Sequence, residues 1–150
     1  MTAPVVRLAV TADAAAVTDL VAGAYDRYVA RIGRRPAPMD ADYPALIEQG
    51  AVRVAELDGE IIGVLVTEER SDHLLLDNVA VSSSARGRGV GGLLIETAER
   101  LAKDAGLPEV RLYTNAAMTE NLEYYPRRGY VETHRGGQAG FARVFFTKPV

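Results

Sequence analysis

The chain has 150 residues, 48% of them hydrophobic and 25% charged, which fits one compact domain over residues 1–150. A net charge of −3 argues against nucleic acid as a partner, because nucleic-acid-binding proteins usually present a basic surface. No cysteine is present, which excludes disulfides, thiolate metal sites and a cysteine nucleophile. The chain shows neither a signal-peptide pattern nor an apolar run of membrane-spanning length, so we expect a cytoplasmic protein without a membrane partner.

The N-terminal third predicts a strand over residues 5–10 and then a helix. Thr11 is expected to N-cap this helix, with Asp13 in its first turn. Apolar residues recur at helical spacing and predict one buried stripe, made of Val17, Leu20, Val21, Ala24 and Tyr28. A loop from about Gly33 and a short helix at about residues 42–49 follow.

The middle of the chain predicts a three-stranded antiparallel meander. Two apolar runs within residues 51–68 are joined at Asp58-Gly59, and Asp-Gly between apolar runs indicates a hairpin. The third run, residues 73–82, is interrupted by Asp77-Asn78 and ends where a glycine-rich segment begins.

The second half predicts a long helix over about residues 90–105, then a strand at 109–115, a short helix at 118–128 and a final antiparallel pair within 129–148. One face of the long helix is expected to be buried, with Val90, Leu93, Leu94, Thr97, Leu101 and Ala105 on it.

The glycine-rich segment lies between a strand and a helix, an arrangement that presents backbone N–H groups to phosphates. Gly87, Gly89 and Gly92 fit the dinucleotide pattern G-x-G-x-x-G, but the segment follows a hairpin meander and not the first strand of a βαβ unit. No Gly-Lys-Ser/Thr follows, which excludes a P-loop. Two arginines beside a helix N-terminus favour anion binding over a purely structural turn.

Two motifs in this order resemble the GNAT acetyltransferases. Arg86-x-x-Gly89-x-Gly91 resembles the family's Arg/Gln-x-x-Gly-x-Gly/Ala motif, and Tyr125, four residues before Gly129-Tyr130, resembles its later motif. The element order β-α-α-β-β-β-α-β-α-β-β extends the resemblance over essentially the whole chain. It implies an α/β (α+β) fold, with a central mixed, mostly antiparallel sheet flanked by helices and a splayed pair of parallel strands.

The resemblance implies acetyl-coenzyme A (acetyl-CoA) as co-substrate. Its pyrophosphate would lie on the loop formed by Arg86, Gly87, Arg88, Gly89, Val90, Gly91 and Gly92. Its pantetheine arm would run between the splayed strands, near Val79, Ala80, Val81, Asn115, Asn121 and Tyr125. Arg88 could instead be a solvated loop residue, Asn115 a turn residue and Asn121 a polar helix position. No metal is expected, since neither His73 nor His134 has a second ligand at metal spacing.

Acyl transfer to an amine needs an oxyanion donor, an acid and a base. A backbone N–H of Val79 or Ala80 suits the first role. The resemblance assigns Tyr125 to protonate the departing thiolate; the alternative is that Tyr125 only packs on the sheet. Its neighbour Tyr124 points elsewhere, because one helical residue rotates a side chain by about 100°.

The base is less directly indicated by the motifs. Many relatives carry a glutamate where this chain has Leu75, a departure from the family pattern. Asp77 follows two residues later, on the same strand face unless a bulge intervenes, and could accept the amine proton directly or through water. It could equally be a solvent-facing carboxylate or an acceptor anchor.

We therefore predict an N-acetyltransferase that transfers acetyl directly from acetyl-CoA to a primary amine of a small molecule or peptide. The resemblance places the acceptor cleft beside the first helices, where the candidates are Tyr25, Tyr28, Met39, Asp40, Asp42 and Tyr43. Tyrosines and carboxylates would suit a cationic amine; alternatively, Tyr28 is core and the aspartates cap a helix. Rival functions are a non-catalytic acyl-CoA sensor and a protein N-terminal acetyltransferase. Homodimers are common in the family, and a homodimer is one of the partner arrangements that the resemblance allows.

Overall fold

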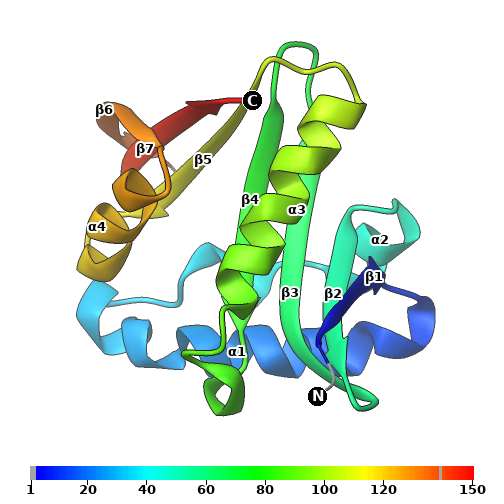
Figure 1. Ribbon diagram of the computed structural model, residues 1–150. Helices are drawn as coiled ribbons and strands as arrows, with labels where there is room; N and C mark the ends of the chain where they lie inside the picture. Colours follow the sequence, from blue (N-terminus) through cyan, green and yellow to red (C-terminus); the bar gives the residue numbers. More distant parts are fainter. Residues whose placement is uncertain (1–2, 139) are drawn as a thin grey trace.

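The computed structural model describes residues 3–138 and 140–150. Across these residues the strands form one seven-stranded sheet in the order β1-β2-β3-β4-β5-β7-β6 (Figure 1). Neighbouring strands are antiparallel except β4 and β5, which confirms the mixed, mostly antiparallel sheet. The strands are β1 (Val5–Leu8), β2 (Val52–Leu57), β3 (Glu60–Glu69), β4 (Leu74–Val81), β5 (Glu109–Asn115), β6 (Val131–Gln138) and β7 (Phe141–Pro149).

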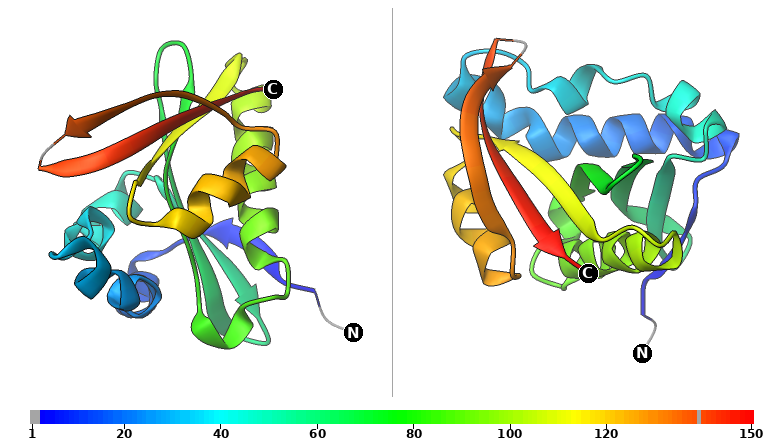
Figure 2. Two further views of the ribbon diagram at one scale, coloured as in Figure 1. Left: turned by 90° about the vertical axis from the view of Figure 1, so that its left-hand side faces the viewer. Right: turned by 90° about the horizontal axis from the view of Figure 1, so that it is seen from above.

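Helices cover both faces of the sheet, in the predicted element order. They are α1 (Ala14–Ile32), α2 (Tyr43–Glu48), α3 (Val90–Asp104) and α4 (Thr119–Arg127), with short 3₁₀ turns at Thr11–Asp13, Ala37–Asp40 and Ser83–Ala85. One core lies under α1 and α2, and a second lies under α3 and α4, on the other face (Figure 2). None of the helices described is both long enough and apolar enough to cross a membrane.

The start of α1 differs from the prediction. Thr11 does not cap the helix; it opens a 3₁₀ turn, and α1 begins at Ala14. Asp13 accepts a hydrogen bond of 2.8 Å from the Val10 N–H and pairs with Arg7 at 2.8 Å. The carboxylate closes this turn in place of the threonine hydroxyl, because charge-assisted hydrogen bonds are the stronger ones. The bond from Arg7 also lowers the pKa of Asp13.

Helix α3 packs closely on the sheet. Its buried face is rotated from the predicted one: Ile95, Ala98 and Ala102 are buried, whereas Ala105 is exposed. Gly63 on β3 explains the close approach, because a Cβ atom there would lie 2.8 Å from Val90 Cγ1 and 2.9 Å from Leu94 Cδ1. The lack of a side chain at Gly63 therefore lets Val90 and Leu94, in the first turns of α3, lie directly against the sheet.

Strand β4 carries a β-bulge at the interruption in its apolar run. Val66 of β3 pairs with Asn78 and the next residue, Thr67, pairs with Leu76, so Asp77 is the extra residue. The side chain of Leu76 packs in the core under α3. Beyond the bulge, the side chain of Asn78 faces α1 on the other side of the sheet, and that of Val79 faces α3 again. Such a bulge re-aims side chains. Asp77 and Asn78 consequently both lie on the side opposite the α3 core.

The parallel strands β4 and β5 splay apart. In the described chain their pairing is limited to Leu74 with Val110 and Leu75 with Arg111. Beyond these pairs β5 slants away from β4, as Figure 1 shows. The predicted splayed parallel pair is confirmed.

Candidate active site

A cavity of about 620 Å³ passes through the sheet where β4 and β5 diverge. On one side it is lined by Val90, Ile95 and Leu112, which belong to the α3 core. On the other side it reaches Tyr25 of α1 and Tyr43 of α2. A volume of this size is typical of a small-molecule site. The opening therefore connects the two faces of the sheet through the gap between the strands.

The glycine-rich turn forms one end of this cavity. Gly87 and Gly89 each have φ of +78°, a left-handed conformation that favours glycine, and Gly89 directly precedes α3. The N–H groups of the first turn of a helix lack intrahelical partners and attract anions. All residues of this turn line the cavity except Arg88, namely Arg86, Gly87, Gly89, Val90, Gly91 and Gly92.

Backbone groups of β4 point into the gap. The Ser82 N–H donates to the Ile62 carbonyl of β3 at 2.9 Å. In a strand, the N–H and C=O of one residue point to the same edge and the edge alternates with each residue. Ala80 therefore faces β3, and Val79 and Val81 face the gap; the Tyr25 hydroxyl accordingly lies 3.4 Å from the Val79 carbonyl oxygen. The Ala80 backbone is thus directed to β3, although all three of these residues line the cavity.

Asp77 is the one acidic side chain lining the cavity in the described part of the chain. Its Oδ1 accepts a hydrogen bond of 3.2 Å from the hydroxyl of Tyr113 on β5. Burial raises the pKa of Asp77, although the bond from Tyr113 works in the opposite direction. The guanidinium carbon of Arg143 lies 4.2 Å from the centroid of the Tyr113 ring. A carboxylate of raised pKa in a cavity fits proton abstraction.

Tyr125 lies in the α3 core and also lines the cavity. Its ring packs against Tyr130 and Phe146 at centroid distances of 5.7 and 5.9 Å. Burial raises the pKa of Tyr125 further above that of an ordinary phenol, so its hydroxyl keeps its proton. Tyr124 lines the cavity as well, but it is 36% exposed. The two neighbouring tyrosines therefore both reach the cavity, and they differ in burial, with Tyr125 only 9% exposed.

Asn78 anchors a hydrogen-bond chain that the sequence analysis missed. The Tyr25 hydroxyl donates to Asn78 Oδ1 at 2.6 Å, and Asn78 Nδ2 donates to the Tyr43 hydroxyl at 3.1 Å. Tyr43 in turn donates to the Pro38 carbonyl. Asn78 is only 5% exposed, and both its amide oxygen and its amide nitrogen have a hydrogen-bond partner in this chain. The bulged strand is thereby tied to α1, α2 and the loop between them. An asparagine inside an apolar strand run was the available signal.

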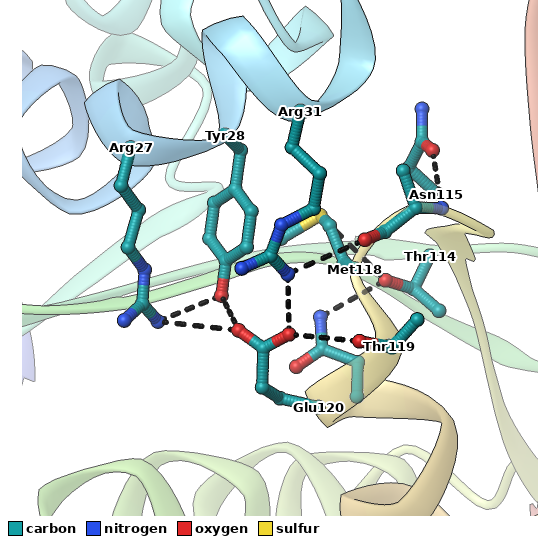
Figure 3. A network of polar contacts seen from close by, with 10 residues as sticks. Arg27, Tyr28, Arg31, Thr114, Asn115, Met118, Thr119 and Glu120 are labelled. Carbon is teal, nitrogen blue, oxygen red and sulfur yellow. Dashed lines mark hydrogen bonds and ion pairs between the residues drawn. The ribbon is translucent and has the colours of Figure 1, made fainter.

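A polar cluster joins α1 to α4 beside the cavity (Figure 3). Glu120 of α4 accepts hydrogen bonds from Tyr28 and Arg31, and Arg27 lies 3.8 Å from the same carboxylate. The backbone N–H of Glu120, followed by the bonds from Arg31 and Tyr28, lowers the pKa of Glu120 to about 2. On the same helix, Asn121 Nδ2 donates to Thr114 Oγ1 at 2.9 Å. The cluster ties the helix that carries Tyr25 to the helix that carries Tyr125.

The model of the acetyltransferase (GNAT) family matches residues 18–130. The chain belongs to the GNAT family. A mycothiol acetyltransferase of Jonesia denitrificans is 33% identical over 85 residues, which make up 57% of this chain. The matched stretch spans only 25% of that relative.

Solved structures of other GNAT proteins have the same fold. The PaiA N-acetyltransferase of Thermoplasma acidophilum, solved in complex with coenzyme A, superposes with a TM-score of 0.83 at 14% identity, over 99% of this chain and 100% of that one. A GNAT acetyltransferase of Listeria monocytogenes superposes with a TM-score of 0.78 at 20% identity, over 100% and 99%. These likenesses confirm the predicted fold.

Some of the predicted acceptor residues line the cavity, and others do not. Tyr25, Tyr28 and Tyr43 line it, whereas Met39, Asp40 and Asp42 do not. Asp40 forms an ion pair of 2.9 Å with Arg35, and Asp42 caps α2 by accepting from the Ala45 N–H. These aspartates have local partners, which explains why they stay away from the cavity.

The two asparagines both line the cavity, and both have partners within the protein. Asn115 Oδ1 accepts from the Ala117 N–H at 2.9 Å and thereby shapes the turn after β5. Asn121 bonds to Thr114, as described above. The cavity residues missed by the sequence analysis are chiefly Asn78, Tyr113 and Arg143; Tyr113 is separated from its partner Asp77 by 36 residues.

Proposed function

We propose that this protein is an N-acetyltransferase that transfers an acetyl group directly from acetyl-CoA to a primary amine of a small molecule. The observation that carries the proposal is the cavity through the sheet, with an anion-binding glycine turn at one end and Asp77 and Tyr125 on its walls. Membership of the GNAT family and the coenzyme A complex of the T. acidophilum relative support it.

The residues present fit this donor. Gly89 and Gly91 leave the backbone open to a pyrophosphate at the start of α3. The gap-facing C=O of Val79 and the N–H and C=O of Val81 would bind the amides of the pantetheine arm in the manner of an added strand. Bound acetyl-CoA would supply the activated acyl group as a thioester.

Three groups of the protein supply the base, the oxyanion donor and the acid for the transfer. Asp77 accepts a proton from the amine, for which its raised pKa suits it. The Val79 N–H donates to the carbonyl oxygen as negative charge develops on it. The Tyr125 hydroxyl donates its proton to the sulfur as the carbon–sulfur bond breaks. The cavity must hold both the pantetheine end and the acceptor within about 620 Å³, which favours a small amine over a peptide.

The test is thiol release from acetyl-CoA across a panel of primary amines. Tyr125→Phe should lower kcat by roughly ten- to a thousandfold in single-turnover measurements, with donor affinity nearly unchanged. Tyr130→Phe is the matched control: its hydroxyl is also buried but donates to Glu99, away from the cavity, so kcat should stay close to that of the wild type. Donor binding without turnover on any amine would instead indicate an acyl-CoA sensor.

A further inference from the structure

The acceptor end of the cavity differs from the cationic-amine site that the sequence suggests. Asp40 and Asp42 are engaged elsewhere, which leaves Asp77 as the acidic lining residue among those described. Arg27 and Arg143 line the cavity instead. Asp77 is thus the single described lining carboxylate available to a polyamine, whose second positive charge would find no partner among the described lining residues, so polyamine binding is disfavoured.

Arg27 is largely balanced by its surroundings. Its guanidinium donates to the Tyr28 hydroxyl at 2.7 Å and lies 3.8 Å from Glu120, and its side chain is 51% exposed (Figure 3). Arg27 therefore acts mainly in the cluster that joins α1 to α4.

Arg143 stands next to the proposed base. Its guanidinium lies over the face of the Tyr113 ring, and the hydroxyl of that ring donates to Asp77. Cation and carboxylate are thus separated by a single aromatic side chain. The positive charge of Arg143 also lowers the pKa of Asp77, against the larger effect of burial. A guanidinium carries its N–H donors in its own plane, so it can bind an oxyanion through one edge while its other edges keep partners within the protein.

We propose that the acceptor is a small amine that also carries an oxyanion group, with Arg143 binding the oxyanion while the amine faces Asp77. The inference rests on the proposed acetyltransferase function and specifies its substrate class. An α-amino acid has the required arrangement, because its amine and carboxylate share one carbon; an aminoalkyl phosphate offers the same chemistry. Pro36, Pro38 and Phe141 also line the cavity and would contact an apolar substituent.

The test compares matched acceptors with acetyl-CoA as donor. Each standard L-amino acid is paired with its carboxamide, and ethanolamine phosphate is paired with ethanolamine; spermidine represents the polyamines. We expect the oxyanion member of at least one pair to have a kcat/KM about ten- to a hundredfold above its neutral partner. The two kinds of pair distinguish a carboxylate from a phosphate.

Arg143→Gln should raise KM for the oxyanion acceptor by about ten- to a hundredfold and leave KM for the neutral partner unchanged. Arg70→Gln is the matched control, because Arg70 also lowers the pKa of Asp77 but does not line the cavity. Its preference for the oxyanion acceptor should equal that of the wild type. Thermal melting and acetyl-CoA affinity confirm that each variant is folded.

The outcomes separate the two proposals. Efficient turnover of neutral amines or spermidine with no preference for an oxyanion would overturn the inference and leave the acetyltransferase function standing. The same conclusion holds if Arg143→Gln and Arg70→Gln alter the preference equally. Absence of turnover on every amine would overturn both.

Discussion

Replacing Gly63 by alanine tests how α3 is held against the sheet. A Cβ atom at Gly63 would meet Val90 Cγ1 at 2.8 Å and Leu94 Cδ1 at 2.9 Å, both closer than carbon atoms approach without displacement. Leu94 can change rotamer, but the β-branched Val90 is stiff and opens α3 at the glycine turn. The extra methyl should therefore move the helix and the turn together.

The expected effect can be bounded from two opposing contributions. Overpacking of a core costs about 1–3 kcal/mol, and replacing glycine in the unfolded chain recovers about 0.4–1 kcal/mol. A net loss of about 1–2 kcal/mol corresponds to a fall in Tm of roughly 2–8 °C for a domain of this size. Gly23→Ala is the matched control: a Cβ there has no atom within 4 Å, and alanine in helix α1 should raise Tm by about 1–4 °C.

Differential scanning calorimetry of both variants measures these shifts, and titration with coenzyme A reports on the glycine turn. We expect opposite signs of the Tm change and weaker coenzyme A binding only in Gly63→Ala. A Gly63→Ala protein as stable as the wild type would refute the reasoning, since it would mean that α3 can retreat from the sheet without cost.

Further substitutions test the donor site, the base and the hydrogen-bond chain. A Cβ at Gly91 would meet only ordinary contacts, so Gly91→Val should fold normally yet raise the Kd of coenzyme A at least about tenfold in calorimetric titration; unchanged affinity would remove the pyrophosphate assignment. Asp77→Asn should lower kcat/KM most at low pH, where the amine is protonated, and partly recover as pH rises. Burial raises the folded-state pKa of Asp77, so the ionised carboxylate opposes folding once the pH exceeds that pKa. Asp77→Asn should therefore melt at an equal or higher temperature than the wild type at neutral pH. A lower Tm for Asp77→Asn would contradict the argument that the buried charge is destabilising. Asn78→Leu removes two buried hydrogen bonds and should lose about 1–3 kcal/mol in urea unfolding; a loss near zero would show that the chain from Tyr25 to Tyr43 contributes no stability.

Local patterns were sufficient to predict the order of the elements and the glycine turn that lines the cavity. The hairpin at Asp58-Gly59, the glycine turn and the Tyr125 motif each depend on residues close together in the chain, and so they can be recognised without the fold. Asp77 is an intermediate case: its residue type suggested a base, but the bulge that turns it comes from the register of β4 against β3.

The residues at the end of the cavity that we propose for the acceptor were decided only by the tertiary structure. Asn78 lies 53 residues from Tyr25, and Arg143 reaches Tyr113 because β7 pairs with β5, so no periodicity in either segment indicates that they meet. Conversely, Asp40 suggested a cationic acceptor but pairs with Arg35, five residues away. The charge of a cavity depends on which side chains long-range packing directs into it, whereas the turns that build its walls depend on neighbouring residues alone.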